Sequence, residues 1–352
     1  MKRRLDSDLT KVGDLPLTRS LAKQYAPTRA RLQFIEAAAE IIENPTKPEA
    51  AFLARQLVLC TLPHADPGDV PIFTRRCGAV TLTLVPYLDR RTGKTIGYPF
   101  GSIPRLLLFW ITTEAVQKKT RRLELGRSLA DFMRAIGLNP DTGGGKRSDA
   151  KRLAEQARRL FRSTISFEAT EEDGEAIREA WDDMQVAPRG EFWWSKASPE
   201  QSALWGSWIE LSEGFYNAIT AAPVPFDMRA LRALKRSPLA LDLYAWACYT
   251  AFAIIAKRLE PQFVSWKRLL RQFGAGYTDS DDFKRKAKVG LRKVAAVYPG
   301  LAIQTKPGGF TIHANRLAMP TRPLVEKSVN RKVIHGETVT PNTVKRSPLE
   351  RV

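Results

Sequence analysis

An internal repeat with a period of roughly 135 residues is the feature that most constrains the fold of this chain. Residues 128–137 and 265–274 align without a gap, and each segment begins with serine and ends with glycine. Apolar residues at positions i, i+3, i+4 and i+7 indicate one buried helix face in both segments. They are Leu129, Phe132, Met133 and Ile136 in the first copy, and Trp266, Leu269, Leu270 and Phe273 in the second. Two related modules are therefore expected.

Similar sequence signals surround this helix in both copies. An apolar helix precedes it, opened by Ser102 and Pro104 in the first copy and by Ser237 and Pro238 in the second. Serine as the N-cap residue with proline in the first turn is a common helix start, and the glycine that closes the aligned segment is a predicted C′ cap. A third helix follows in each copy, rich in lysine and arginine.

Strands are predicted after each third helix. Ile165 and Phe167 alternate with polar residues in the first copy, and Lys306-Pro-Gly-Gly309 marks a hairpin turn in the second. Three helices followed by a hairpin is the order of a winged helix-turn-helix domain. The expected fold class is mostly α (α+β), with two tandem winged helix-turn-helix domains that carry small β-hairpin wings.

Domain boundaries follow from the repeat and from composition. Ahead of the first copy, a helix is predicted over 28–43 and a strand over 80–85, with a turn at 89–93. Both chain ends are basic and lack hydrophobic periodicity, so flexible tails are expected. The expected parts are a basic tail (1–27), a leader of one helix and small strands (28–99), a first winged-helix domain (100–222), a second, DNA-binding winged-helix domain (223–319) and another basic tail (320–352).

Charge indicates the partner. The 352 residues include 56 Lys and Arg against 37 Asp and Glu, a net charge of +19, which favours a polyanion, with nucleic acid as the default. A hydrophobic content of 43% excludes wholesale disorder. The longest apolar stretch, 243–256, is shorter than the ~20 residues of a membrane span, so it is predicted to be a buried helix. A soluble cytoplasmic protein without a membrane partner is expected.

The third helix of the second copy is predicted to bind DNA. On a helical wheel, Phe283, Ala287, Leu291 and Val294 fall on one side. Lys284, Arg285, Lys288 and Arg292 fall on the other side, and Lys286 and Lys293 lie on the opposite flank. Lysine and arginine there can hold phosphates, and arginine can read guanine edges. The candidate DNA-binding residues of this copy are Lys284, Arg285, Lys288, Arg292 and Lys293, with Lys267 and Arg268 on the second helix and Lys306 at the hairpin. The alternative is a charged helix face that is merely solvated.

The third helix of the first copy has the same design. Its apolar stripe contains Leu153, Ala157, Leu160 and Phe161. The candidate DNA-binding residues of this copy are Arg147, Lys151, Arg152, Arg158 and Arg159. The segment taken as its wing, residues 168–183, contains eight acidic side chains and one arginine, which phosphates would repel. That segment is therefore hypothesised to make a protein contact such as a homodimer.

The sequence contains little evidence for a catalytic site. His64, His313 and His335 are isolated, with no metal-ligand spacing, and the three cysteines form no CxxC pair. Residues 143–147 fail the phosphate-loop spacing, and the aromatic residues around Phe192 and Trp208 are interpreted as core. No catalytic residue, metal or cofactor is expected, and the chain is not expected to be an enzyme.

Part of the sequence resembles a known family. The segments Phe192-Trp-Trp194, Leu204-Trp-Gly-Ser-Trp-Ile-Glu-Leu-Ser-Glu213, Pro223-Val-Pro225 and Leu231-Arg-Ala-Leu-Lys-Arg-Ser-Pro-Leu-Ala-Leu-Asp-Leu-Tyr244 look like the plasmid-encoded RepA replication initiators of bacteria. The resemblance covers roughly residues 100–318 and is strongest over 192–312.

The resemblance implies a protein that binds double-stranded DNA at repeated sites of a plasmid origin, starts replication and recruits host replication proteins such as a helicase or its loader. It supplies no catalytic residues. A winged-helix transcriptional repressor is the alternative, and a primase or nicking nuclease is a third class.

Overall fold

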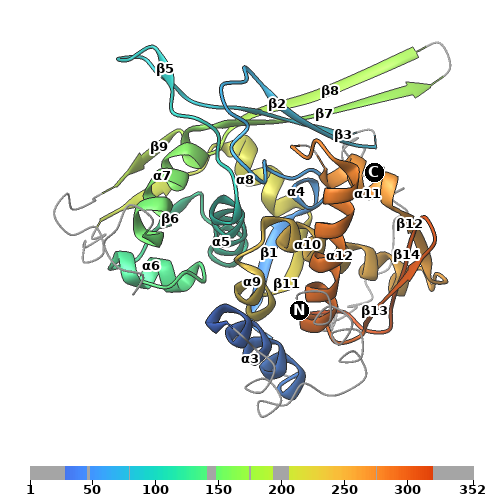
Figure 1. Cartoon of the computed structure of the whole chain (residues 1–352). Coiled ribbons are helices and arrows are strands. Elements are labelled where there is room, and N and C mark those ends of the chain that lie inside the picture. Colours follow the sequence, from blue (N-terminus) through green and yellow to red (C-terminus); the bar gives the residue numbers. More distant parts are fainter. Residues whose placement is uncertain are drawn as a thin grey trace, which may run out of the picture.

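The computed structural model describes residues 28–45, 48–78, 80–140, 148–173, 176–192, 206–274 and 276–319, with the backbone alone at 169–180. The two expected tails, 1–27 and 320–352, lie outside these ranges. The described residues form a mixed α+β fold with ten helices (Figure 1). The helices are α3 (Arg29–Glu43), α4 (Arg55–Leu59), α5 (Ser102–Lys118), α6 (Leu129–Ala135), α7 (Asp149–Arg162), α8 (Glu213–Ala221), α9 (Met228–Leu234), α10 (Pro238–Ala256), α11 (Trp266–Phe273) and α12 (Ser280–Val297).

The strands of the described residues form small sheets in which every pairing is antiparallel. The two-stranded sheets are β1 (Ala50–Ala54) with β11 (Pro223–Asp227), and β4 (Leu88–Asp89) with β5 (Lys94–Thr95). The larger sheets have the orders β2 (Phe73–Cys77), β3 (Val80–Val85), β7 (Thr164–Asp173), β8 (Ala176–Gln185); β6 (Arg122–Glu124), β10 (Trp208–Glu210), β9 (Arg189–Glu191); and β12 (Gln262–Ser265), β14 (Gly309–Ala314), β13 (Leu301–Lys306). The predicted helix at 28–43 and strand at 80–85 are confirmed.

The same arrangement of elements occurs twice along the chain. We call 102–210 the first unit and 238–314 the second unit. Apart from the β7–β8 hairpin, which is inserted after α7, the first unit has the order α5, β6, α6, α7, β9, β10. The second unit has the order α10, β12, α11, α12, β13, β14. In each unit the last strand lies in the middle of a three-stranded sheet. Strand β10 lies between β6 and β9, and strand β14 lies between β12 and β13. The period seen in the sequence thus corresponds to a repeated strand order.

The acidic segment 168–183 differs from the prediction. It lies in the long β7–β8 hairpin, which is inserted between α7 and β9 and pairs with β3 rather than with β6. The prediction that this hairpin is the wing of the first copy is therefore wrong, because its strands do not pair with the strand that follows the first helix of that copy. The hairpin that pairs with β6 is β9–β10, because Ile209 of β10 lies opposite Leu123 of β6 and Gly190 of β9.

Most of the predicted helix starts are confirmed by capping hydrogen bonds. The hydroxyls of Ser128, Ser148, Ser237 and Ser265 each accept a hydrogen bond from a backbone N–H of the first turn. Ser102 is an exception, because α5 already includes it and the N-cap residue is Gly101, with a φ of 82°. A side chain is rarely tolerated at that φ, which explains why glycine stands there.

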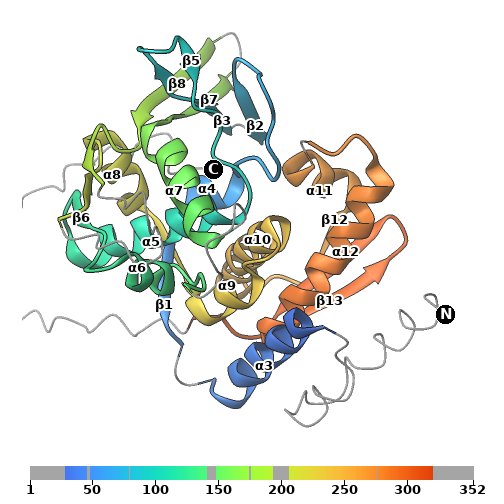
Figure 2. The ribbon, with the colours of Figure 1, turned by 60° about the vertical axis from the view of Figure 1, so that its left-hand side comes forward.

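The long helices α5 and α10 form the centre of the core and lie next to each other (Figure 2). Both are buried on nearly all sides, as expected for helices with no dominant polar face. Among the described residues, α10 is the one helix long and apolar enough to cross a membrane, yet 67% of its apolar 18-residue stretch is buried inside the protein. The prediction of a buried helix is confirmed here.

A buried ionic cluster joins the first helices of the two units. Arg105 of α5 donates from Nε and Nη2 to the two carboxylate oxygens of Asp242 of α10, at 2.7 and 2.8 Å. These residues are 137 positions apart, the same separation that relates 128 to 265. His64 Nε2 lies 2.7 Å from Asp242 Oδ2, so the expectation of an isolated His64 is wrong.

The charge states within this cluster follow from burial and pairing. Burial alone would raise the pKa of Asp242, but the charge of Arg105 and the hydrogen bonds from His64 and Arg105 lower it to about 2. Burial lowers the pKa of His64 and outweighs the effect of Asp242. A neutral His64 can donate its Nε2 proton to the ionised carboxylate, and Arg105 also donates to the carbonyls of Leu62, Pro63 and Gly101.

Candidate nucleic-acid interface

Helix α12 separates an apolar face from a basic face, as the sequence predicts. Asp279 caps its N-terminus by accepting hydrogen bonds from the N–H groups of residues 281 and 282. The predicted apolar positions Phe283, Ala287, Leu291 and Val294 are all buried. Gly290 belongs to the same face, where a Cβ atom would come within 2.8 Å of Leu243 of α10, so glycine permits the close approach of the two helices.

The basic residues of α12 reach the surface to different degrees. Arg285, Lys286 and Arg292 are exposed, and 71% of the Arg285 side chain is accessible. The remaining candidates of this helix are half-buried: Lys284, Lys288 and Lys293. The exposed charge of α12 therefore comes from the two arginines, which lie opposite Phe283, and from Lys286, which lies on the flank about 100° from Arg285.

Local contacts hold several of these cations in place. The carboxylate of Asp282 accepts from Arg285 at 2.6 Å and from Lys286 at 2.8 Å, and these hydrogen bonds lower the pKa of Asp282. Lys286 also lies over the ring of Tyr277, and Lys288 over the ring of Trp266, at 5.1 and 5.6 Å. Such cation–π contacts orient the ammonium groups without neutralising them.

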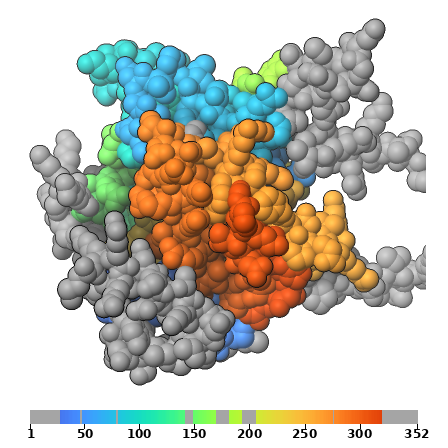
Figure 3. Space-filling model, turned by 45° about the vertical axis from the view of Figure 1, so that its right-hand side comes forward, coloured from blue at the N-terminus to red at the C-terminus, as the bar shows by residue number. Residues whose placement is uncertain are grey.

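Helix α11 and the β13–β14 turn extend the basic surface of the second unit. Lys267 and Arg268, both predicted from the sequence, are exposed on α11, and Lys306 is exposed at the turn. Arg271 is also exposed. Arg271 is not among the residues predicted from the sequence, although its spacing of four residues from Lys267 places both on one helix face. Figure 3 shows the second unit, in orange and red, as a continuous outer surface of the molecule.

The first unit places its predicted basic residues less uniformly. Lys151, Arg152 and Arg158 of α7 are exposed, whereas Arg147 lies outside the described residues. Arg159 is turned inward, with 15% of its side chain accessible. It contacts Asp66 at 3.4 Å and Glu155 at 2.5 Å, and it donates to the carbonyl of Tyr98. Arg159 therefore anchors neighbouring segments, a role that conflicts with direct DNA contact.

The predicted core role of the aromatic segment holds for the residues that are described. Phe192 stacks on Phe161, with ring centroids 5.5 Å apart and an interplanar angle of 9°. Trp208 is half-buried, and the guanidinium of Arg122 lies over its ring at 4.1 Å. Trp193, Trp194 and Trp205 lie outside the described residues.

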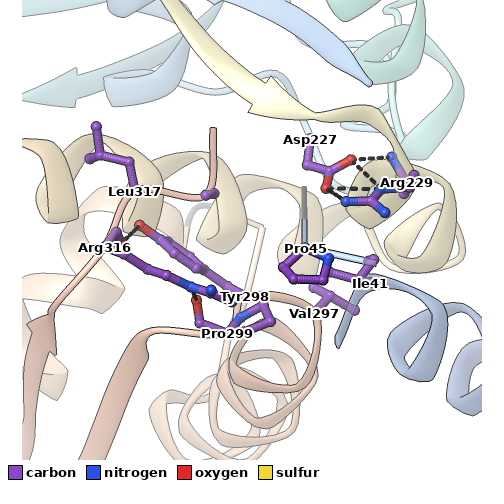
Figure 4. A pocket seen from close by; sticks show the side chains of 10 residues that line it. Ile41, Pro45, Asp227, Arg229, Val297, Tyr298, Pro299, Arg316 and Leu317 are labelled. Atoms are coloured by element: carbon purple, nitrogen blue, oxygen red, sulfur yellow. Dashed lines mark hydrogen bonds and ion pairs between the residues drawn. The ribbon is translucent and has the colours of Figure 1, made fainter. Parts of the chain in front are cut away.

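A pocket of about 330 Å³ lies between α3, the start of α9 and the end of α12 (Figure 4). Its polar groups bind one another: Arg229 pairs with Asp227 at 2.7 Å, and the Tyr298 hydroxyl donates to the Arg316 carbonyl at 3.0 Å. Burial raises the pKa of Tyr298, which keeps the phenol protonated. Within the described residues, no group of three or more His, Cys, Asp or Glu side chains is placed to hold a metal ion.

Comparison with known proteins finds one matching family model and two similar structures. The sequence model of the family "Plasmid encoded RepA protein" matches residues 98–268. Crystal structures of domains 2 and 3 of RctB are similar: one has a TM-score of 0.44 and 11% identity over 71% of this chain and 93% of that chain, and the other has 0.43 and 12% over 71% and 92%. No curated protein matches the sequence.

Proposed function

We propose that this chain, which residues 98–268 identify with plasmid-encoded RepA proteins, is a non-catalytic replication initiator that binds double-stranded origin DNA. One observation carries the DNA-binding part of this proposal. The helix α12 buries one face against α10, exposes Arg285 and Arg292 on the opposite face and exposes Lys286 on the flank. A rigid helix with a cationic outer face fits the major groove and its phosphates.

In this proposal the two units are winged helix-turn-helix domains, within 100–222 and 223–319, preceded by a leader of residues 28–99. The second unit supports this because α10, α11 and α12 are followed by a hairpin whose last strand pairs with β12. Helix α12 then enters the major groove, and Lys306 at the β13–β14 turn contacts the backbone or the minor groove. The second unit is the main DNA-binding domain, and Lys151, Arg152 and Arg158 supply a second footprint.

Footprinting on the DNA that flanks the gene tests the initiator role. Repeated protected sites beside an AT-rich block support an initiator. A plasmid that lacks the gene and still replicates would favour the alternative, a transcriptional repressor with the same fold. Incorporation of labelled nucleotides or strand cleavage by the pure protein, lost when a carboxylate is replaced, would favour an enzyme.

The affinity for origin DNA is expected to fall steeply with salt. Each neutralised phosphate releases counterions and contributes about −0.9 to the slope of log K against log salt, so six contacts give a slope near −5. Titration of a labelled duplex between roughly 50 and 200 mM salt measures this slope. A flat plot would contradict phosphate binding by the basic faces.

A homodimer through the β7–β8 hairpin remains part of the proposal. Strand β8 lies at the edge of its sheet, and Trp181 on it is 72% exposed. An edge strand with an exposed aromatic side chain is a typical protein contact. Replacing Trp181 with glutamate is expected to shift the protein toward the monomer in light scattering, with the melting temperature unchanged because the side chain is exposed. An unchanged mass distribution would exclude this surface.

The remaining partners are proposed from the family alone. A cytoplasmic initiator that opens an origin needs a host helicase or helicase loader, and purified candidates can be tested for retention by the chain bound to origin DNA.

A further inference from the structure

The β4–β5 hairpin has a basic tip. Arg90, Arg91 and Lys94 are all exposed there, and 91% of the Arg91 side chain is accessible. The acidic residue of the tip, Asp89, lies 3.8 Å from Arg91. The sequence marks this segment as a turn only. In the fold it projects beyond the body of the molecule, on the side of α7 (Figures 1 and 2).

The tip has a defined conformation. Asp89 accepts hydrogen bonds at its side chain from the N–H of Arg91, at 3.0 Å, and at its carbonyl from the N–H of Gly93, at 2.8 Å. Gly93 has a φ of 67°, which closes the turn without side-chain strain. A preorganised tip loses less conformational entropy on binding than a mobile loop would.

The root of the hairpin is fastened to the third helix of the first unit. The guanidinium of Arg162 lies 3.5 Å from the centre of the Tyr87 ring, at the start of the hairpin. After the hairpin, Arg159 donates to the carbonyl of Tyr98 at 3.1 Å, and the N–H of Phe100 donates to Gln156 at 2.8 Å. Gln156, Arg159 and Arg162 follow one another at intervals of three residues, so they form one row along α7.

This attachment divides the surface of α7. The hairpin root contacts the row of Gln156, Arg159 and Arg162. Arg158 in the C-terminal half stays exposed, as do Lys151 and Arg152 in the N-terminal half. In helix-turn-helix proteins the N-terminal half of the third helix contacts the bases. Arg159 points inward because it holds the hairpin root. This inward position conflicts with DNA contact.

We propose that the β4–β5 hairpin is the DNA-contacting arm of the first unit, with Arg90, Arg91 and Lys94 bound to the phosphates of the duplex beside the contacts of α7. The inference rests on the proposed DNA binding. It assigns to this hairpin the backbone contact that the acidic β7–β8 hairpin cannot make, since carboxylates are repelled by phosphates. Duplex DNA is favoured over a protein partner because three cations stand against one carboxylate at the tip, residues 89–94. The exposed apolar side chain of the hairpin, Leu88, lies before the tip.

The test compares two double variants on origin DNA. Arg90→Ala with Arg91→Ala is expected to weaken binding roughly tenfold, to make the salt slope shallower by about 2 and to shorten the footprint at one end. The matched control, Arg29→Ala with Arg31→Ala, removes the same charge from α3, which lies at the opposite end of the molecule (Figures 1 and 2). The control is expected to bind like the wild type.

The outcomes separate this inference from the proposed function. If the wild-type chain binds origin DNA and the hairpin variant has the same affinity, salt slope and footprint, the hairpin assignment is wrong and the initiator proposal stands. Equal weakening by the control would show a general charge effect and also overturn the assignment. Reduced self-association of the hairpin variant with unchanged DNA affinity would assign the hairpin to a protein contact instead. No binding by the wild type would refute the proposed function itself.

Discussion

Replacing Arg285, Lys288 and Arg292 together with alanine is expected to cost several kcal/mol of DNA-binding free energy, at about 1 kcal/mol or more per contact. The reason is that Arg285 and Arg292 are exposed at the centre of the basic face of α12, whose opposite face is buried in the core. Footprinting and titration on origin DNA measure the loss. A footprint equal to that of the wild type would refute the assignment of α12 as the DNA-binding helix.

Two controls keep this result interpretable. Lys288 lies over the ring of Trp266, so its removal also changes packing, and the melting temperature of the triple variant must be measured. The double variant Arg285→Lys with Arg292→Lys keeps both charges but lacks the guanidinium fork. If it retains non-specific binding but loses preference for origin DNA, the arginines read bases. If it keeps that preference, they contact phosphates only.

Replacing Asp242 with alanine is expected to lower the free energy of unfolding by about 3–5 kcal/mol, the usual effect of leaving a buried charge without its partner. Asp242 is the carboxylate that accepts two hydrogen bonds from the buried Arg105 and one from His64. Denaturant unfolding measures the loss. An unchanged free energy of unfolding would contradict the buried ion pair between α5 and α10.

A double variant and a pH series test the same cluster. Arg105→Met with Asp242→Leu removes both charges and is expected to be much less destabilised than Asp242→Ala, because no buried charge remains unpaired. In the wild type the lowered pKa of Asp242, about 2 against an ordinary 3.8, contributes stability that is complete above pH 4 and is lost as the pH falls toward 2. The lowered pKa of His64 adds a loss that begins below its ordinary value of 6.5. In the double variant Asp242→Leu with Arg105→Met, the free energy of unfolding should depend less on pH in the acid range.

Much of the local structure of both units could be predicted from the sequence. The wheel of residues 283–298 places the apolar side chains of α12 on its buried face, and serine caps mark the helix starts at 128, 148, 237 and 265. These features depend on residues within one or two helical turns. Short-range periodicity and capping chemistry are therefore sufficient to predict these features.

The pairing of distant segments could not be predicted in the same way. The strands that complete the sheet of the first unit lie beyond an inserted hairpin, so adjacency in sequence points to β7–β8 instead of β9–β10. Likewise, the charge pattern treats Arg159 and Arg158 alike. The fold separates them, because only Arg159 lies against the root of the β4–β5 hairpin.

The sequence by itself determined the repeat, the amphipathic third helices and the excess of positive charge, because each is a property of composition or of spacing along one element. The tertiary structure decided which charges face solvent and which hold the molecule together. Arg105 and Asp242 are ordinary ionisable residues in the sequence, 137 positions apart. They become a buried ion pair only because α5 and α10 pack side by side, and a charge in a low-dielectric core requires a partner that no local pattern can identify.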